Sequence, residues 1–412
     1  MRFLRALCRL VFGLTFIFSG LVKLLSPVGT SLIFQEYFSA LHLGFLSGTA
    51  LYAGMLLAVA EFTVGMCILL SVRMKLMTGV GFYMCCFFTL LTLYLALFNP
   101  ISDCGCFGEA VHLTNWQTFF KNLILLPCIA LLYFQRKKID PIAAPAVEWV
   151  FAGFFFVVGV GLWLHSYLYV PMYEFTPYKI GSHISDEDDD ADFVTTFIYS
   201  KDGENRSFTL EDLPDSTWTY VETVTEMTGT AGQYSDFIIQ DAYGNDITPN
   251  LLYSDDAVLI SIYDPAKLKA RQWERIEAFA QKVTAAGADL YIASSAADQG
   301  IPDDFPLEVG YGDRKLLLTI NRSNGGATLF SDGYLSQKWT QATMDGAEFE
   351  GLLSDDGETL VLRNAIHSNV RTSCLVLGIL LVMILIYYIC KISYKGSSLN
   401  KLKRNKQSRT LN

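Results

Sequence analysis

Charged side chains are scarce in this 412-residue chain. Asp, Glu, Lys and Arg make up 17% of the residues, whereas soluble domains average about 25%, and 51% of the residues are hydrophobic. This shortage excludes a wholly soluble globular protein. The apolar residues concentrate before residue 173 and again at residues 372–390. The composition therefore predicts a membrane protein with one large polar insertion.

Cysteine is absent from residues 129–373, and the whole chain has only five histidines. A thiol–disulfide reaction needs a nucleophilic thiolate, so this stretch cannot carry one out. His165, His183 and His367 are isolated and imply no metal site. The acidic run at 186–190 lacks the spacing of an EF-hand calcium loop, which indicates a solvated linker. No basic patch is interleaved with aromatics here, which excludes nucleic acid as a partner.

The two kinds of charge are segregated along the chain. Residues 171–370 contain 35 acidic and 13 basic side chains, which gives them a net charge of −22. The remaining residues hold 6 acids and 18 bases, a net charge of +12. An acidic soluble region is therefore fused to a basic membrane region.

Six apolar segments are long enough to cross a bilayer, which takes about 20 residues. Proline follows the end of three of them, at Pro27, Pro100 and Pro171, where it cannot continue the helix. We expect six membrane-spanning helices. They run from about Phe3 to Leu25, Thr49 to Ser71, Leu76 to Phe98, Trp116 to Phe134, Trp149 to Val170 and Thr372 to Cys390.

Basic residues mark the cytoplasmic ends of membrane helices. They cluster near the N-terminus, between the second and third segments, at residues 136–138, and in the tail at 392–412, after a sixth helix at 372–391. Six alternating crossings put all four clusters on one side. We therefore expect a multi-pass protein of the bacterial inner membrane with both termini in the cytoplasm. Residues 171–371 would then be extracytoplasmic, as would the loop at 99–115.

Residues 31–46 are apolar but too short to add another crossing. They lie between the first two predicted spans. We interpret them as an amphipathic helix lying on the outer surface of the bilayer.

Two of the nine cysteines, Cys104 and Cys106, lie in a predicted outer loop rather than in a span. The compartment outside a bacterial inner membrane permits disulfides. Gly105 between them admits unusual backbone angles, and a ring closed at this spacing should be strained. Strained and exposed disulfides tend to exchange readily. Thr114 or Asn115 could cap the following helix, whose positive end favours a thiolate nearby.

Three interpretations of this loop remain open. The first is a redox-active pair, with Asp103, Gly105, Phe107 and Gly108 shaping the loop. The second is a static disulfide that closes the loop. The third is a metal site formed by Asp103, both thiols and His112, although this set has no further cysteine or histidine cluster beside it.

One carboxylate, Glu61, lies in the middle of the second span. An ionised group in hydrocarbon is costly, so Glu61 should face the interior of the helix bundle and find a partner there. Arg9 and Lys23 on the first span are the candidates. The pair would either lock two helices together or take part in quinone or proton handling.

The N-terminal pattern resembles that of the DoxX-like membrane family. It includes Phe18-Ser-Gly20, Lys23 and Glu61, and the loop Asp103-Cys-Gly-Cys-Phe-Gly108 is similar to the MauE, or methylamine-utilisation, branch. The resemblance covers about residues 1–135 and implies a unit of four membrane helices. It also implies thiol–disulfide exchange outside the cytoplasm, because MauE proteins are implicated in maturing a disulfide-rich dehydrogenase subunit.

The acidic region shows strand and helix patterns. Residues 194–210 predict a hairpin, and a second pattern runs from Asp236–Asp241 through a turn to Leu251–Tyr253. A buried strand at 258–263, a helix over 267–285 and a strand at 290–293 predict a parallel βαβ unit. The chain then shows a second hairpin at 326–339.

This order resembles the thioredoxin-like fold over residues 236–345. The junction at Tyr263–Lys267 occupies the place of the family's Trp-Cys-x-x-Cys motif but contains no cysteine. The resemblance implies a degenerate domain that binds or positions a client. The overall expectation is an α-helical membrane bundle joined to an α/β thioredoxin-like extracytoplasmic domain.

Two functions from different classes follow from these patterns. The first is a membrane-bound thiol–disulfide redox protein, a thiol–disulfide oxidoreductase acting through Cys104 and Cys106 on an extracytoplasmic thiol protein. Its electrons could pass to a quinone in the bundle, although no cofactor motif is evident. The second is a non-catalytic membrane scaffold whose soluble domain binds a partner and whose cysteine pair is a structural disulfide.

Overall fold

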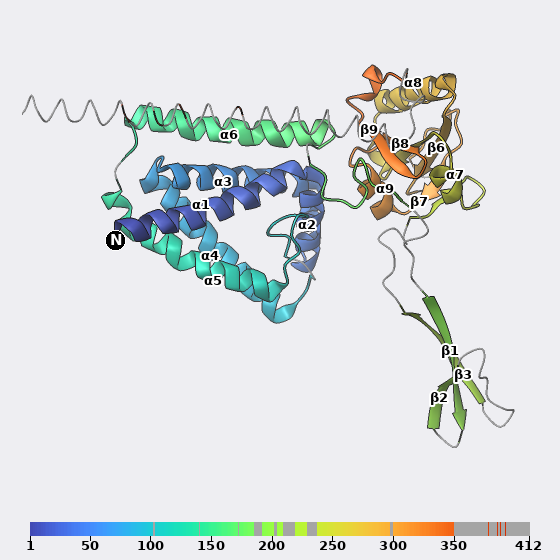
Figure 1. The fold of residues 1–412 in the computed structure, drawn as a ribbon, viewed down its shortest axis with the longest axis horizontal. Helices are drawn as coiled ribbons and strands as arrows, with labels where there is room; N and C mark the ends of the chain where they lie inside the picture. The colour runs from blue at the N-terminus through green and yellow to red at the C-terminus, as the bar shows by residue number, and fades with distance from the viewer. Residues whose placement is uncertain are drawn as a thin grey trace, which may run out of the picture. The chain divides into compact units, whose positions relative to one another are not determined.

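The computed structural model of the chain describes most of residues 1–349. The described residues are 1–101, 104–139, 141–171, 173–184, 192–201, 204–208, 219–228, 237–296 and 300–349, with residues 378, 385, 388 and 392 farther on. The chain divides into two compact units (Figure 1). We call Met1–Thr176 with Ile366–Asn412 the helical unit, and Pro177–Ala365 the α/β unit.

Five helices in the described part of the chain are long and apolar enough to cross a membrane. They agree with the first five predicted spans to within a few residues. The sixth predicted span and the basic tail lie, apart from single residues, outside the described residues. The helices of this unit are α1 (Arg2–Leu25), α2 (Pro27–Ala40), α3 (Ala50–Leu70), α4 (Met74–Phe98), α5 (Asn115–Gln135) and α6 (Pro145–Leu168).

Local sequence explains where these helices begin and end. Proline occupies the first turn of α2 and of α6, where its missing N–H costs no hydrogen bond. Asn99 ends α4 in the left-handed conformation, with a φ of 45°. Thr114 begins α5 with a capping box, in which its hydroxyl accepts from the Gln117 N–H while the Gln117 side chain accepts from the Thr114 N–H. The predicted cap at Thr114 is therefore confirmed.

The segment predicted as a surface helix has different bounds. Helix α2 begins at Pro27, directly after α1, and ends at Ala40, and a short 3₁₀ helix follows at Gly44–Thr49. The prediction of a helix is confirmed, but the range 31–46 was wrong at both ends because Pro27 starts a new helix one residue after α1. Figure 1 shows α2 lying across the end of the unit at which α1 finishes.

Helices α1 and α3 pack closely because glycine lies at their contact. A Cβ on Gly20 would lie 2.5 Å from the Phe62 backbone nitrogen, and one on Gly65 would lie 2.7 Å from that of Ile17. Small residues let membrane helices approach in this way. Helix α6 adds the fully buried Phe155 to the core that α1, α3, α4 and α5 share.

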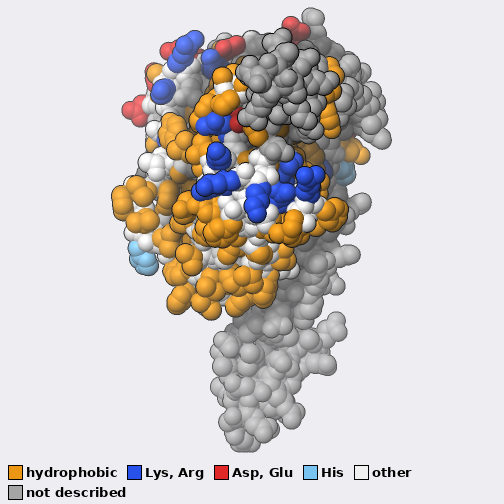
Figure 2. All heavy atoms as spheres, turned by 90° about the vertical axis from the view of Figure 1, so that its left-hand side faces the viewer, with side chains coloured by type: hydrophobic (Ala, Val, Ile, Leu, Met, Phe, Trp, Pro, Cys, Tyr) orange, Lys and Arg blue, Asp and Glu red, His pale blue; other side chains and the backbone are white. Residues whose placement is uncertain are grey.

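Basic side chains gather at the end of the helical unit opposite α2. The Arg5 guanidinium donates to the Lys138 carbonyl at 2.6 Å, and that of Arg136 donates to the Lys75 carbonyl at 3.5 Å. Figure 2 shows Lys and Arg gathered on this end beside hydrophobic surface. Three of the four predicted basic clusters therefore lie at one end. Its assignment to the cytoplasm stays a prediction.

The α/β unit contains two sheets. The first is antiparallel, with strand order β2-β1-β3, and the second is mixed, with order β4-β7-β6-β5-β8-β9. Their strands are β1 (Asp192–Lys201), β2 (Glu204–Phe208), β3 (Thr219–Thr228), β4 (Ile239–Gln240), β5 (Ala257–Ile262), β6 (Asp289–Ser294), β7 (Gly310–Gly312), β8 (Gly326–Ser331) and β9 (Tyr334–Trp339).

Most of the predicted elements of this unit are confirmed. Strands β5 and β6 are parallel and joined by α8 (Ala270–Ala286), whose buried face is the predicted one, and β8 and β9 form the late hairpin. Strands β1 and β2 form the early hairpin. Core side chains lie on both faces of the larger sheet.

One predicted strand is wrong. Leu251 and Leu252 belong to the short helix α7 (Thr248–Leu252) rather than to a strand after the turn at 243–246. Pro249 lies in its first turn, and the Asp246 carboxylate accepts from the Thr248 N–H at 2.9 Å. These local signals for a helix outweigh the apolar pattern of Leu251–Tyr253. The short strand β4 pairs instead with β7, and α9 (Arg314–Ile320) follows β7.

Candidate functional site

The cysteine loop joins α4 to α5 and is clamped at its base. The Asn115 side-chain amide donates to the Asn99 side-chain carbonyl at 2.8 Å and to the Ile101 carbonyl at 2.7 Å. Asn115 is buried, so these bonds are shielded from water. The two ends of the loop are therefore held together, and the chain between them must turn back over the helix ends.

Two glycines make the turn that carries the cysteines. Gly105 and Gly108 have φ values of +60° and +55°, and the Gly108 N–H donates to the Gly105 carbonyl at 2.9 Å. A Cβ on Gly105 would lie 2.6 Å from Cγ2 of Ile33 on α2. Glycine is thus required both by the backbone angle and by the contact with α2. Asp103, which was also predicted to shape the loop, lies outside the described residues.

The two sulfurs face each other. The Sγ atoms of Cys104 and Cys106 lie 2.6 Å apart, so bond formation needs a shift of roughly 0.5 Å. Cys104 is buried, with 2% of its surface exposed, and Cys106 is half-buried. The expectation of an exposed pair is therefore wrong for Cys104. The reason is tertiary, because α2 covers the loop.

The pKa values of the two thiols are shifted in opposite directions. A hydrogen bond from the Cys106 thiol lowers the pKa of Cys104 from 9.0 to about 6, with a smaller contribution from the Lys121 ammonium. The same hydrogen bond raises the pKa of Cys106 well above 9.0, because it holds the proton there. At neutral pH the reduced pair is therefore a Cys104 thiolate that accepts from a Cys106 thiol.

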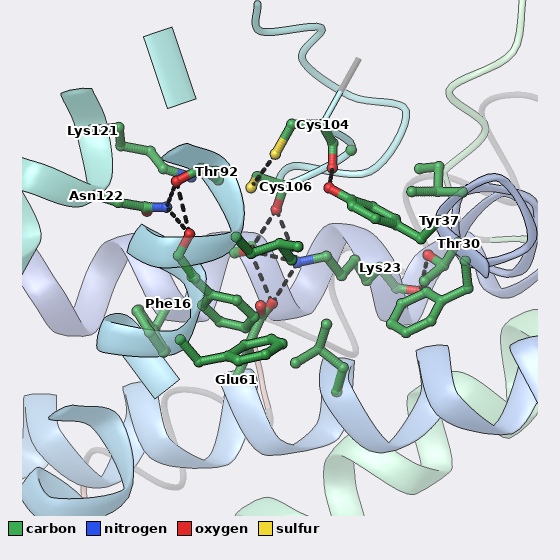
Figure 3. Close-up of a pocket in the computed structure, with 18 of the residues that line it drawn as sticks. Phe16, Lys23, Thr30, Tyr37, Glu61, Thr92, Cys104, Cys106, Lys121 and Asn122 are labelled. Atoms are coloured by element: carbon green, nitrogen blue, oxygen red, sulfur yellow. Dashed lines mark hydrogen bonds and ion pairs between the residues drawn. The ribbon is translucent and has the colours of Figure 1, made fainter. Parts of the chain in front are cut away.

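A buried ion pair supports this loop from below (Figure 3). The Lys23 ammonium lies 2.7 Å from the Glu61 carboxylate and donates to the Cys106 carbonyl at 2.9 Å. Ser19 lies within hydrogen-bond distance of all three of these groups. The predicted intramembrane charge of Glu61 therefore has a partner, and this partner, Lys23, also holds the backbone of the cysteine loop. The sequence did not identify Ser19 or the link to Cys106.

Lys23, rather than Arg9, is the partner of Glu61. The Arg9 guanidinium donates to the Leu69 carbonyl at 3.0 Å, where α3 ends. Arg9 lies about four helical turns before Lys23 on α1, so one carboxylate cannot serve both. The candidate list was correct, but only packing selects between its members.

Four further side chains at the loop were not predicted. The Tyr37 hydroxyl of α2 donates to the Cys104 carbonyl at 2.6 Å, and Ser26 donates to the Glu109 carboxylate at 2.5 Å. The Lys121 ammonium lies 4.2 Å from the centre of the Phe107 ring. No ion pair of Lys121 occurs within the described part of the chain. A lysine inside the apolar fourth span was the one available sequence signal.

The dithiol forms part of the wall of a cavity of about 270 Å³. Aromatic and aliphatic side chains dominate the lining, and Figure 3 shows Lys121 and Asn122 on the same side as the sulfurs. Cys104, Gly105 and Cys106 come from the loop. The other lining residues are Thr15, Phe16, Ser19, Lys23, Thr30, Ile33, Phe34, Tyr37, Phe38, Leu41, Leu57, Glu61, Phe87, Phe88, Leu91, Thr92, Lys121, Asn122 and Leu125.

A metal centre finds no support in the described residues. No group of three or more His, Cys, Asp and Glu side chains among them could hold an ion. His112 of the proposed set is exposed, while Cys104 is buried. Asp103, the remaining member, is not described, so the metal interpretation stays a prediction.

The junction between β5 and α8 contains no cysteine and is built from polar side chains. The Asp264 carboxylate lies 2.7 Å from the Lys267 ammonium. The Asn324 side chain donates to the Asp264 carbonyl at 2.6 Å and accepts from its N–H at 3.1 Å. This junction is therefore held by polar contacts and has no nucleophilic thiol.

Residues 1–135 match the family model described as "Methylamine utilisation protein MauE". The MauE match spans α1 to α5 and thus every residue that lines the cavity. Together with the five apolar helices, it points to a multi-pass membrane protein.

A second family model matches residues 193–228, outside the MauE segment. It is described as "Domain of unknown function (DUF8463)" and covers the three-stranded sheet. Comparison with curated proteins and with solved structures returned no match. The DoxX-like and thioredoxin-like resemblances stay predictions.

Proposed function

We propose that this chain is a membrane thiol–disulfide redox protein in which Cys104 and Cys106 cycle between a dithiol and a disulfide. The observation that carries the proposal is the pair of facing sulfurs 2.6 Å apart on the wall of a cavity. Gly105 and Gly108 shape the turn, and the Lys23–Glu61 pair holds its backbone. The function implied by the resemblance to MauE is consistent with this chemistry.

The acidity of Cys104 supports oxidation of the client rather than its reduction. A pKa of about 6 stabilises the reduced pair at neutral pH, because Cys104 is then a thiolate. A dithiol whose reduced form is stabilised forms an oxidising disulfide. We therefore propose that the disulfide accepts two electrons from a client dithiol.

The exchange follows from the accessibility of the two sulfurs. A client thiolate attacks the sulfur of Cys106, which is the half-buried residue of the pair, and the bond to Cys104 breaks, which leaves Cys104 as a stable thiolate. The second client thiolate then attacks the client sulfur of this mixed disulfide and releases Cys106, which takes up a proton. The client is oxidised to a disulfide, and the pair is reduced.

The setting of this reaction is part of the proposal. The client is a thiol protein outside the cytoplasm, where disulfides persist, and the α/β unit binds or positions it. The description of the matched family makes methylamine utilisation the context to test first. The bacterial inner membrane and cytoplasmic termini complete the proposed arrangement.

Trapping a mixed disulfide tests the proposal. In Cys104→Ser, Cys106 can no longer form the internal disulfide. After mild oxidation with diamide it should form a mixed disulfide with the client, and this adduct should accumulate on a non-reducing gel because Cys104 is not there to displace the client. Cys106→Ser should give no protein adduct, because Cys104 is 2% exposed. Cys86→Ser, at a half-buried cysteine within α4, is the matched control and should behave as the parent chain.

A structural disulfide predicts a different outcome. If the pair only closes the loop of a scaffold, neither variant traps an adduct, and the native chain resists thiol labelling under every redox condition. That result would overturn the redox proposal and favour a scaffold that recruits its partner through the α/β unit.

A further inference from the structure

The cavity beside the dithiol opens through an apolar mouth. Phe87 of α4 and Leu41, which follows α2, line the cavity, yet they are 60% and 39% exposed. Phe87 lies midway along a helix that is long and apolar enough to cross a membrane. A ligand that enters here therefore comes from the hydrocarbon of the bilayer, so charged, water-soluble oxidants are disfavoured.

The interior of the cavity combines apolar walls with a few convergent polar groups, as ligand pockets do. Its volume, about 270 Å³, is close to the lower end for such pockets. The Lys121 ammonium stands on the wall shared with the cysteines and has no ion pair within the described residues. Within the described residues, the hydrogen bonds of the neighbouring Asn122 amide are long, 3.2 Å to the Thr92 hydroxyl and 3.4 Å to the Phe88 carbonyl.

We infer that this cavity binds a quinone, and that the quinone reoxidises the Cys104–Cys106 dithiol. This inference rests on the proposed function. The ligand must be apolar to enter, small and flat enough for an aromatic-lined space, and able to take two electrons and two protons. It must also carry oxygens that accept from Lys121 and Asn122. A lipid-soluble quinone meets each of these requirements.

The reaction balances in atoms and electrons. The Cys104 thiolate adds to the quinone ring, and negative charge develops on the ring oxygen, where the Lys121 ammonium stabilises it. The Cys106 thiol loses its proton and attacks the Cys104 sulfur. The S–S bond forms and the C–S bond breaks, so that two electrons leave with the ring. The proton of the Cys106 thiol and one proton taken up from water complete the quinol.

The test uses the full chain, reduced and held without oxygen in lipid nanodiscs. Decylubiquinone or menadione is added, quinone loss is followed by absorbance, and the disulfide is followed by alkylation mass shift. We expect one quinone to be reduced per disulfide formed, and no reaction in Cys104→Ser. In parallel, diamide is used as a small oxidant that does not depend on the Lys121 and Asn122 contacts proposed for the quinone.

The two arms separate the possible failures. Oxidation by diamide but by neither quinone would overturn the quinone site and leave the proposed function standing. Oxidation by neither reagent would overturn both. Oxidation by both, with quinol formed in equal amount, supports both.

Paired tryptophan variants test the location. Leu91 lines the cavity, whereas the adjacent Leu90 is 69% exposed on the outside of α4. Leu91→Trp should slow the quinone reaction about tenfold or more by filling the cavity, and Leu90→Trp should not. Lys121→Met should slow it roughly 100-fold at saturating quinone. Diamide should oxidise both tryptophan variants at the parent rate, which shows that they are folded, and circular dichroism reports the folding of Lys121→Met. Equal quinone rates in the two tryptophan variants would overturn the site.

Discussion

The helical unit and the α/β unit use buried polar side chains to hold backbone carbonyls, but to different ends. In the α/β unit, the Asn321 amide donates to the Ala327 and Trp339 carbonyls at 2.9 and 3.2 Å, and the buried Lys338 ammonium donates to the Tyr178 carbonyl. These bonds join strands and loops. In the helical unit, Lys23 holds the carbonyl of Cys106.

The comparison shows that the same kind of hydrogen bond can either stabilise the fold or position a functional group. A buried amine bound to a carbonyl fixes the backbone wherever it occurs. Under the proposed function it becomes part of a reactive site in the helical unit, where the fixed residue carries a thiol beside a cavity. The α/β unit has no cysteine, so its contribution under the proposed function is binding. Four predictions test this division.

The largest expected effect is on the buried ion pair. Glu61→Ala leaves the Lys23 ammonium buried without its counter-charge and should lower the free energy of unfolding by about 3–5 kcal/mol. Unfolding in detergent, followed by circular dichroism, measures it. The double variant Lys23→Met/Glu61→Leu should recover most of this stability but not the position of the loop. Equal losses in the single and double variants would contradict the role of the pair.

A core change in the α/β unit should leave the dithiol untouched. Ile276→Ala removes a fully buried side chain of α8 and should lower the free energy of unfolding of the α/β unit by about 2–5 kcal/mol. Glu274→Ala, at an exposed position of the same helix, should change it little. Limited proteolysis of residues 237–349 reports the loss. Oxidation of the cysteine pair by diamide should keep the parent rate, while the trapped client adduct should decrease. A slowed diamide reaction would contradict the independence of the units.

The contact between α1 and α3 should tolerate no added methyl group. Gly20→Ala places a Cβ 2.5 Å from the Phe62 backbone nitrogen and should destabilise the helical unit by about 1–3 kcal/mol. Gly153→Ala, in α6, has open space around its Cβ and should instead stabilise by about 0.5–1 kcal/mol. Thermal unfolding measures the change in midpoint temperature of both variants. Changes of the same sign would contradict the prediction.

The smallest expected effect is on the acidity of Cys104. Since its pKa is lowered to about 6, its alkylation by iodoacetamide should rise with pH to a midpoint near 6 and then level off. Lys121→Met removes a favourable charge and should move the midpoint upward by about one pH unit. Mass spectrometry of the labelled peptide measures both curves. A midpoint near 9 in the parent chain would contradict the thiolate.

Sequence patterns predicted most elements of both units. Runs of about 20 apolar residues identified five helices. Their alternating direction was consistent with the finding that three of the basic clusters lie at one end of the helical unit. The face of α8 and the parallel pairing of β5 with β6 followed from periodicity. Leu251 was misassigned because two adjacent apolar residues do not show a helical or strand period. Pro249, in the first turn of α7, favours the helix that is observed.

The site was predicted only in part. Cys104, Cys106 and Glu61 stood out because a thiol pair in a loop and a carboxylate in a span are rare. The contribution of α2 was missed, since nothing in the sequence shows that Ile33 and Tyr37 lie against residues 104 and 105. The burial of Cys104 was missed for the same reason.

The sequence by itself determined that the chain has apolar spans, an acidic α/β region and one dithiol in a loop, because composition, length and periodicity act locally. Only the tertiary structure decided that Lys23 rather than Arg9 meets Glu61, that this pair holds the Cys106 carbonyl, and that the sulfurs border a cavity. Those outcomes depend on which residues, tens of positions apart, are brought within about 3 Å, the range of a hydrogen bond.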